Sequence, residues 1–299
     1  MSDRRFAIRR AIEQLDPERD HQRIVHLSFG YDFPWDSIRA LEIALYRTYC
    51  VPSISALLDR TGEFRMNTQR RYDDTSILVA EMCEWGYESG RGKEALERMN
   101  WVHGHFKIAN DDFLYVLSTF IYEPVRWIDA VGWRPTCVNE KLGYYCFWRE
   151  VGMRMGIAGI PPSYEAFEAW SRAYERQHFR FADTNQRVGT STRDLFASWF
   201  PRIFTPVVRY SIYAMLDEAM ISSFGFPQPL PLTRPALRGV LKLRGRVVGW
   251  LPPRRSAHFF TDDRNRSHPE GYRISRLGPP RIVAAEKQRQ TSNESSRVE

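Results

Sequence analysis

The sequence has few or none of the features that mark several common protein classes. It contains 4 cysteines in 299 residues, and no two of them are spaced as CxxC; they are Cys50, Cys83, Cys137 and Cys146. A chain of this length buries enough apolar surface to fold without disulfides. The cysteines therefore predict buried free thiols, and the pattern excludes a disulfide framework and a zinc knuckle.

Targeting and membrane-spanning segments are also missing from the pattern. No apolar run approaches the ~20 residues that a membrane span needs, and the best run, residues 114–122, contains Ser118 and Thr119. The first residues lead into mixed charge without the apolar region of a signal peptide. We therefore expect a cytoplasmic protein with no transmembrane segment.

Catalytic motifs of the large enzyme classes are absent as well. The chain has no HExxH, no P-loop, no GxSxG and no GxGxxG after a strand, so zinc proteases, P-loop NTPases, α/β-hydrolases and dinucleotide-binding enzymes are excluded. Aromatic residues, in contrast, make up 14% of the chain. That content is typical of a deep core or of an apolar ligand pocket.

The positive charge of the chain is confined to its C-terminal part. Residues 238–299 hold 14 Lys and Arg against 6 Asp and Glu, whereas residues 1–237 hold 29 against 30. Residues 1–237 are close to neutral, so we do not expect this part of the chain to bind nucleic acid. The basic tail predicts a solubilising extension, and it also allows weak contact with acidic surfaces.

Hydrophobic periodicity predicts helices almost everywhere and an all-α fold. The only short strand candidates are residues 246–250 and 272–274. The capping residues predict these helices: one from Asp36–Ser37 to before Pro52, one from an N-cap at Asp74 or Thr75 to Gly86, one over about 92–107, one capped at Asn110–Asp112 and closed by Pro124, one capped by Thr136, one opened by Ser163, and one from Thr205–Pro206 to Gly225.

Composition predicts four parts along the chain. Residues 1–35 form an N-terminal segment and residues 36–237 a helical domain. A basic extension that packs on this domain follows over residues 238–283. Residues 284–299 are polar and lack aromatics, which predicts a disordered tail.

His103 is the histidine with the most informative position. Ala95, Met99, Val102 and Phe106 recur at helical spacing, and His103 falls at the edge of that apolar face, whereas His105 points away from it. An inward imidazole on an apolar wall can bind iron as an axial ligand. A hydrogen-bonded core histidine is the more common alternative, and the pattern alone does not separate the two.

Arg71 and Thr75 form a second candidate pair, within Arg71-Tyr72-Asp73-Asp74-Thr75. They are four residues apart, so they share a face if the helix begins early enough. A cation and a hydroxyl on one face can hold a cofactor carboxylate or donate to a bound oxygen atom. Alternatively, the aspartates stabilise a helix N-terminus and the arginines pair with them.

These two stretches belong to a longer run of similarity. From Ala44 to about Tyr174 the chain resembles the rubber oxygenase (latex-clearing protein) and MpaB-type oxygenase catalytic-domain family. The matching segments are residues 44–49 (ALYRTY), 61–64 (TGEF), 71–75 (RYDDT), 98–103 (RMNWVH), 110–117 (NDDFLYVL), 123–127 (EPVRW), 132–135 (GWRP) and 155–157 (MGI).

The resemblance implies a single globin-like helical domain that binds haem b and uses O2 to cleave a C=C bond of an isoprenoid-like molecule. It places the axial iron ligand at His103, and the distal arginine and threonine at Arg71 and Thr75. Latex-clearing proteins have a lysine directly before that threonine, whereas this chain has Asp74. A lysine-ligated resting state therefore does not carry over.

The leading hypothesis is a haem-dependent oxygenase that takes an apolar, unsaturated small molecule and O2, with Arg71 and Thr75 as catalytic residues. We expect such a small molecule rather than an extracellular polymer, because the chain shows neither an export signal nor a membrane anchor. Two alternatives stay open: a non-catalytic haem or O2 binding module, and a helical interaction protein with a basic tail.

Overall fold

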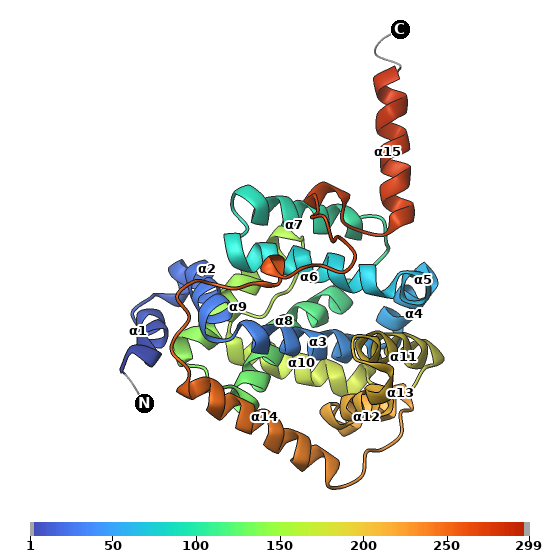
Figure 1. Ribbon diagram of the computed structural model, residues 1–299. Coiled ribbons are helices and arrows are strands. Elements are labelled where there is room, and N and C mark those ends of the chain that lie inside the picture. The colour runs from blue at the N-terminus through green and yellow to red at the C-terminus, as the bar shows by residue number, and fades with distance from the viewer. Residues whose placement is uncertain (1–2, 296–299) are drawn as a thin grey trace. The chain divides into compact units, whose positions relative to one another are not determined.

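The computed structural model describes the backbone of residues 3–295 and the side chains of residues 4–288. Within this range the chain forms helices and no strands, which confirms the all-α prediction (Figure 1). Two compact units are present. Unit 1 combines the chain up to Thr68 with Ala109–Phe259, and unit 2 combines Gln69–Ile108 with the chain from Phe260 onward. The boundaries predicted at residues 36, 238 and 284 stay a prediction.

Unit 1 contains most of the helices. They are η1 (Asp3–Phe6), α1 (Ala7–Glu13), α2 (Pro17–Leu27), the π-helical segment η2 (Ser28–Asp32), α3 (Pro34–Tyr49), α4 (Pro52–Thr61), α5 (Glu63–Met66), α8 (Asn110–Val131), α9 (Val138–Arg154), α10 (Tyr164–His178), α11 (Asp183–Ser198), η3 (Arg202–Phe204), α12 (Thr205–Met215), α13 (Glu218–Phe224) and α14 (Thr233–Trp250). Helix α3 packs along α8, and α2 packs along α9.

Unit 2 is built from two helices, α6 and α7, and from residues 260–295, which we call the C-terminal segment. The elements are α6 (Thr68–Trp85), α7 (Gly90–His103), η4 (Phe260–Asp262), η5 (Ile274–Arg276) and α15 (Pro280–Ser295). In Figure 1, α6 and α7 run side by side and the segment that carries η4 and η5 crosses them. Residues 284–295, expected to be disordered, lie in helix α15, and residues 296–299 lie outside the described range.

The prediction of an N-cap at Asp74 or Thr75 is wrong. Helix α6 begins at Thr68, so both residues lie in its second turn. Asp73 and Asp74 are buried and hydrogen-bonded to the C-terminal segment, so these acids do not mark a helix end. The predicted end at Gly86 is confirmed, because α6 stops at Trp85 and Gly86 has a positive φ of 76°.

Several other helix ends differ from those predicted. Helix α8 continues through Pro124, because its buried side chains Ile121, Val125 and Ile128 form one face that outweighs the hydrogen bond lost at proline. The helix predicted from Thr205 to Gly225 is divided into α12 and α13, because Asp217 caps α13 through the backbone N–H of Met220.

The remaining differences are smaller. Helix α3 begins at Pro34, two residues before the predicted start, and the N-cap of α9 is Cys137 rather than Thr136. Thr205 is the first residue of α12 and not its cap. The strand candidate at 246–250 is the end of α14, and residues 272–274 form no strand. The predictions for Ser163 as an N-cap and for buried free thiols at all four cysteines are confirmed.

An arginine with 12% of its side chain exposed connects four helical elements of unit 1. Arg47 on α3 forms ion pairs with Glu123 of α8, Glu175 of α10 and Asp217 at the start of α13, at 3.0, 3.1 and 2.5 Å. Burial disfavours the charge of Arg47, but the neighbouring carboxylates outweigh burial and raise the pKa of Arg47 well above its ordinary value. The arginine therefore stays charged and ties these helices together.

A second buried ion cluster lies where η2 meets the start of α9. The Arg134 guanidinium donates to Asp32 Oδ2 at 2.6 and 3.0 Å and to the two oxygens of Glu140 at 2.8 and 2.7 Å. All three side chains are at most 2% exposed. Ser28 donates a further hydrogen bond to Glu140 at 2.6 Å. The cluster is stable only while all its charges are present, because each is removed from water.

Within the part of the chain that the structure describes, no helix is both long enough and apolar enough to cross a bilayer.

Replacing Arg134 by Met should lower the free energy of unfolding by about 3–5 kcal/mol, because buried Glu140 loses its cation and buried Asp32 keeps only Arg5, at 3.8 Å. Urea denaturation followed by circular dichroism measures the loss. The matched control is Arg172→Met, which removes an exposed ion pair with Glu168 and should cost less than about 1 kcal/mol. Equal losses for the two variants would contradict the structural role of Arg134.

Candidate active site

The candidate residues Arg71, Thr75 and His103 lie on two helices of unit 2, α6 and α7. Helix α7 begins directly against the end of α6: a Cβ atom on Gly92 would lie 1.5 Å from the carbonyl oxygen of Gly86. No residue with a side chain fits there without moving the backbone. The short connection and this close contact fix the start of α7 against the end of α6.

Arg71 and Thr75 share one face of α6, because the helix begins at Thr68, before both of them. The Arg71 guanidinium donates a hydrogen bond to Thr75 Oγ1. Thr75 Oγ1 in turn donates to the backbone carbonyl of Arg71 at 2.9 Å. The threonine hydroxyl therefore holds the guanidinium along the helix, and both side chains remain partly accessible.

His103 is the last residue of α7, and the helix does not continue to residue 107 as predicted. Loss of solvation and the positive charge of Arg71 lower the pKa of His103 to about 4. The imidazole is therefore neutral at pH 7, and the guanidinium of Arg71 is close enough to influence it. His105 follows the helix, is exposed, and stacks edge-on against Trp101.

Asp73 and Asp74 point to the C-terminal segment of unit 2 and not along the Arg71–Thr75 face. Asp73 Oδ2 accepts from the backbone N–H and the hydroxyl of Ser267 at 3.0 and 2.5 Å. Asp74 accepts from His268 Nε2 at 2.7 Å and from the backbone N–H of Gly278 at 2.9 Å. At about 100° per residue, Asp74 lies roughly 80° from the midpoint of Arg71 and Thr75.

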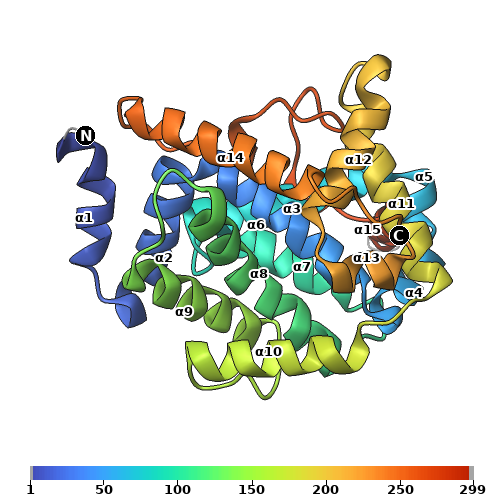
Figure 2. The same ribbon diagram turned by 90° about the horizontal axis from the view of Figure 1, so that it is seen from below.

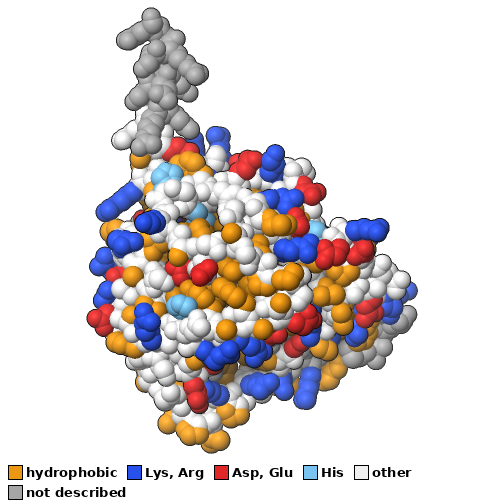
Figure 3. All heavy atoms as spheres, turned by 180° about the vertical axis from the view of Figure 1, so that it is seen from behind, with side chains coloured by type: hydrophobic (Ala, Val, Ile, Leu, Met, Phe, Trp, Pro, Cys, Tyr) orange, Lys and Arg blue, Asp and Glu red, His pale blue; other side chains and the backbone are white. Residues whose placement is uncertain are grey.

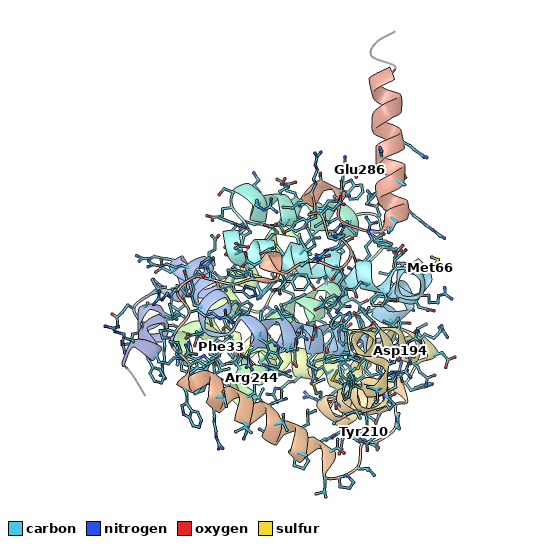
Figure 4. All side chains as sticks on the ribbon, in the orientation of Figure 1. Phe33, Met66, Asp194, Tyr210, Arg244 and Glu286 are labelled. Atoms are coloured by element: carbon cyan, nitrogen blue, oxygen red, sulfur yellow. The ribbon has the colours of Figure 1, made fainter. Side chains whose placement is uncertain are left out.

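Further contacts fix the same segment to α6 and α7. Glu81, which is fully buried, accepts from the hydroxyl of Tyr272 at 2.6 Å and from Arg91 Nε at 2.9 Å. Arg98 of α7 donates to the carbonyl of Leu277 at 2.7 Å and pairs with Glu286 of α15 at 3.0 Å. Figure 4 labels Glu286 beside α15.

The structure thus places the three predicted site residues in one unit, where Arg71 donates to Thr75 and the charge of Arg71 lowers the pKa of His103. The sequence analysis did not find the residues that clamp α6, Ser267, His268 and Gly278. They are 194 or more residues away from the aspartates that they contact. No local pattern in the sequence reports a contact of that separation.

The donor set fits a cofactor that brings its own metal ligands. Among the described residues, no group of three or more histidine, cysteine or acidic side chains is placed to hold a metal ion. Haem iron is already held by its porphyrin and needs one protein nitrogen, for which the neutral imidazole of His103 is suited. Arg71 supplies a cation that can pair with a propionate or another anionic group. Asp74 is not available as a ligand, because the C-terminal segment engages both its oxygens.

Comparisons with known proteins agree on one family. The model described as "ER-bound oxygenase mpaB/B'/Rubber oxygenase, catalytic domain" matches residues 39–250. The chain is 29% identical over 245 residues to ER-bound oxygenase mpaB' of Penicillium brevicompactum, covering 76% of this chain and 58% of that protein. It is 30% identical over 233 residues to ER-bound oxygenase mpaB of Penicillium roqueforti (strain FM164), covering 72% of this chain and 78% of the relative.

Replacing Asp74 by Ala should lower the free energy of unfolding by about 2–4 kcal/mol, because two donors lose a buried charged acceptor. Hydrogen exchange at the Gly278 amide should accelerate in the same variant. Asp111→Ala is the control, since Asp111 is an exposed acid in the first turn of α8 and should cost less than about 1 kcal/mol. Unchanged protection of Gly278 would refute the clamp.

Proposed function

Because the chain belongs to the family of ER-bound oxygenase mpaB/B' and rubber oxygenase catalytic domains, we propose that it is a haem b-dependent oxygenase that acts on an apolar, unsaturated small molecule. Oxidative cleavage of a C=C bond is the proposed reaction. The matched region spans 58% of the first relative, so the activity of that whole protein is carried to this chain only as part of the proposal.

The observation that carries the proposal is the environment of His103. Its imidazole is neutral at physiological pH, sits at the end of a helix whose start is locked against α6, and has a cation and a hydroxyl on the neighbouring helix. A desolvated neutral nitrogen on a rigid element is the kind of ligand that b-type haem requires.

Haem, when bound, supplies the chemistry of O2 activation that no side chain can provide. His103, at the end of α7, would hold the cofactor. Arg71 presents a fixed positive charge to an anionic group or to negative charge that develops on the reactants. Thr75 keeps that guanidinium oriented through the Oγ1 hydrogen bond, so its hydroxyl acts as a positioning group.

Support for the proposed substrate class comes from the family, whose description includes rubber oxygenase. Rubber is an unsaturated isoprenoid hydrocarbon, and a rubber oxygenase acts on such a chain. An apolar alkene gives the protein no charged handle, so we propose that shape and hydrophobic burial select it.

The direct test is an absorbance spectrum and a haem stain of full-length protein expressed with ample haem. A Soret band at one haem per chain, followed by O2-dependent loss of an added isoprenoid alkene, supports the proposal. A Soret band without turnover rejects the enzyme hypothesis and supports a haem or O2 carrier. If the protein contains no haem under these conditions, both haem hypotheses are rejected and the helical interaction protein is the hypothesis that remains.

The ligand assignment predicts different outcomes for two neighbouring histidines. His103→Ala should abolish stoichiometric haem binding, because it removes the desolvated imidazole, whereas His105→Ala should leave the spectrum unchanged, because that side chain is exposed. Haem content per chain is measured together with the circular dichroism spectrum, which reports whether each variant folds. Haem retained in His103→Ala and lost in His105→Ala would reverse the assignment.

Thr75→Val should keep the fold and the haem content but lower turnover per haem by roughly tenfold to a thousandfold, because the Arg71 guanidinium loses its fixed orientation. Thr75→Ser restores the hydroxyl and should recover most of the activity. Thr75 is not an N-cap, so little helix stability is lost with its hydroxyl. Unchanged turnover in Thr75→Val would remove this residue from the site.

A further inference from the structure

Helix α14 has one side fixed against unit 1. A Cβ atom on Gly245 would lie 2.7 Å from the carbonyl oxygen of Val131, so the helix backbone rests directly on the end of α8. Arg244 pairs with the buried Asp36 of α3 at 2.7 Å. Figure 4 shows Arg244 on the side of α14 that faces the rest of unit 1, close to Phe33. These contacts determine which side of α14 faces outward.

The outward side of α14 is apolar. Val240, Leu243, Val247 and Trp250 are 64%, 57%, 44% and 75% exposed. At about 100° per residue they fall within roughly 80° of one another, about 160° away from the buried Gly245 and Gly249. We call these four side chains the α14 stripe. Soluble helices normally bury such a stripe, and here the buried side is the opposite one.

Other exposed apolar side chains lie near the α14 stripe. Helix α12 packs on α14, and Figure 2 shows the two as neighbours. Ile203 before α12 and Val207 within it are exposed, as are Leu230 and Leu232 in the connection that enters α14. In Figure 3 hydrophobic side chains occupy the lower tip of the view, where α14 begins in Figure 1, and Lys and Arg side chains lie just above.

The segment that contains the stripe carries charge of one sign, and two of its cations pair with acids elsewhere in unit 1, Arg244 with Asp36 and Arg234 with Glu218. Between residues 219 and 261 the sequence has seven Lys and Arg and no Asp or Glu. Arg238, Lys242 and Arg246 are exposed on α14. At its end, beside Trp250, Arg4, Arg254 and Arg255 help line a hollow of about 640 Å³. At about 100° per residue, Arg246, Lys242 and Arg238 lie about 80°, 120° and 160° from the centre of the α14 stripe, so Arg246 borders the stripe and the arginines of the hollow lie at its Trp250 end.

We propose that this surface, the α14 stripe with its flanking cations, lies in the headgroup region of a bilayer that contains anionic phospholipids. A helix parallel to the membrane buries its apolar face at the acyl boundary while Lys and Arg reach the phosphates. Trp250 suits the boundary, because its ring is apolar and its N–H is polar. The hollow of arginines would accept a lipid headgroup.

Charge favours the bilayer over a second copy of this chain as the partner. A two-fold dimer places the same surface of both chains face to face. Exposed cations such as Lys242, Arg246 and Arg254 would then oppose their own copies, with no acid between residues 219 and 261 to pair with them. An anionic bilayer instead complements both the charge and the apolar stripe. Haem is not needed for this binding, so the test of this proposal is independent of the test of the proposed function.

Sedimentation of the full chain with vesicles tests the proposal. The protein should bind vesicles of phosphatidylcholine mixed with phosphatidylserine, bind pure phosphatidylcholine weakly, and lose binding to the mixture as salt increases. The variant V240S/L243S/V247S/W250S should bind the mixed vesicles more than about tenfold more weakly. The variant K242Q/R246Q should lose about twenty-fivefold, at about fivefold per cation.

Matched variants elsewhere on unit 1 are the controls. V138S/M153S removes exposed apolar side chains of α9, and R19Q/R172Q/R176Q removes three exposed cations. Both should bind vesicles as the unaltered protein does, and circular dichroism should show that all variants fold. Vesicle binding that survives both α14 variants overturns the proposal. A dimer in analytical ultracentrifugation that the stripe variant dissociates, without vesicle binding, also overturns it and assigns the surface to a second copy.

Discussion

Arg47 lies between three carboxylates that come from different parts of unit 1, Glu123, Glu175 and Asp217. A buried cation is tolerated only while its partners are in place, so this one residue fixes the spacing of α3, α8, α10 and α13. The Arg134 cluster imposes the same requirement where η2 meets α9. Apolar burial supplies the stability of such a helical unit, and these ion clusters restrict how its helices can be arranged.

Buried charges also organise unit 2, but here the buried groups are acids, which lie on α6. Asp73, Asp74 and Glu81 accept hydrogen bonds from the C-terminal segment, and Arg71 and Thr75 occupy another face of the same helix. One helix therefore serves two purposes. The clamp holds α6 rigidly, and a rigid helix is what lets a threonine hydroxyl and a guanidinium keep a defined position relative to His103.

The two proposals concern different parts of the chain, but both involve apolar molecules, an alkene substrate and the lipids of a bilayer. An apolar alkene dissolves in a bilayer far more readily than in water. The bilayer surface that α14 is proposed to contact would therefore also hold the proposed substrate. The cations around α14 belong to unit 1, whereas Arg71 and His103 belong to unit 2, so changes on one surface can be studied without altering the other.

The sequence by itself determined the all-α class, the buried thiols, the family resemblance and the choice of His103, Arg71 and Thr75 as candidates. These follow from periodicity, composition and short motifs, which are local properties of the chain. The tertiary structure decided where α6 begins, that α8 passes through Pro124, and that Asp74 faces His268 and Gly278. It also decided which side of α14 is buried, a choice made by Gly245 and the Arg244–Asp36 pair. Each of these features depends on contacts between residues far apart in the chain. The energies of such contacts exceed local helix propensity, and the contacts produce no periodic pattern in the sequence.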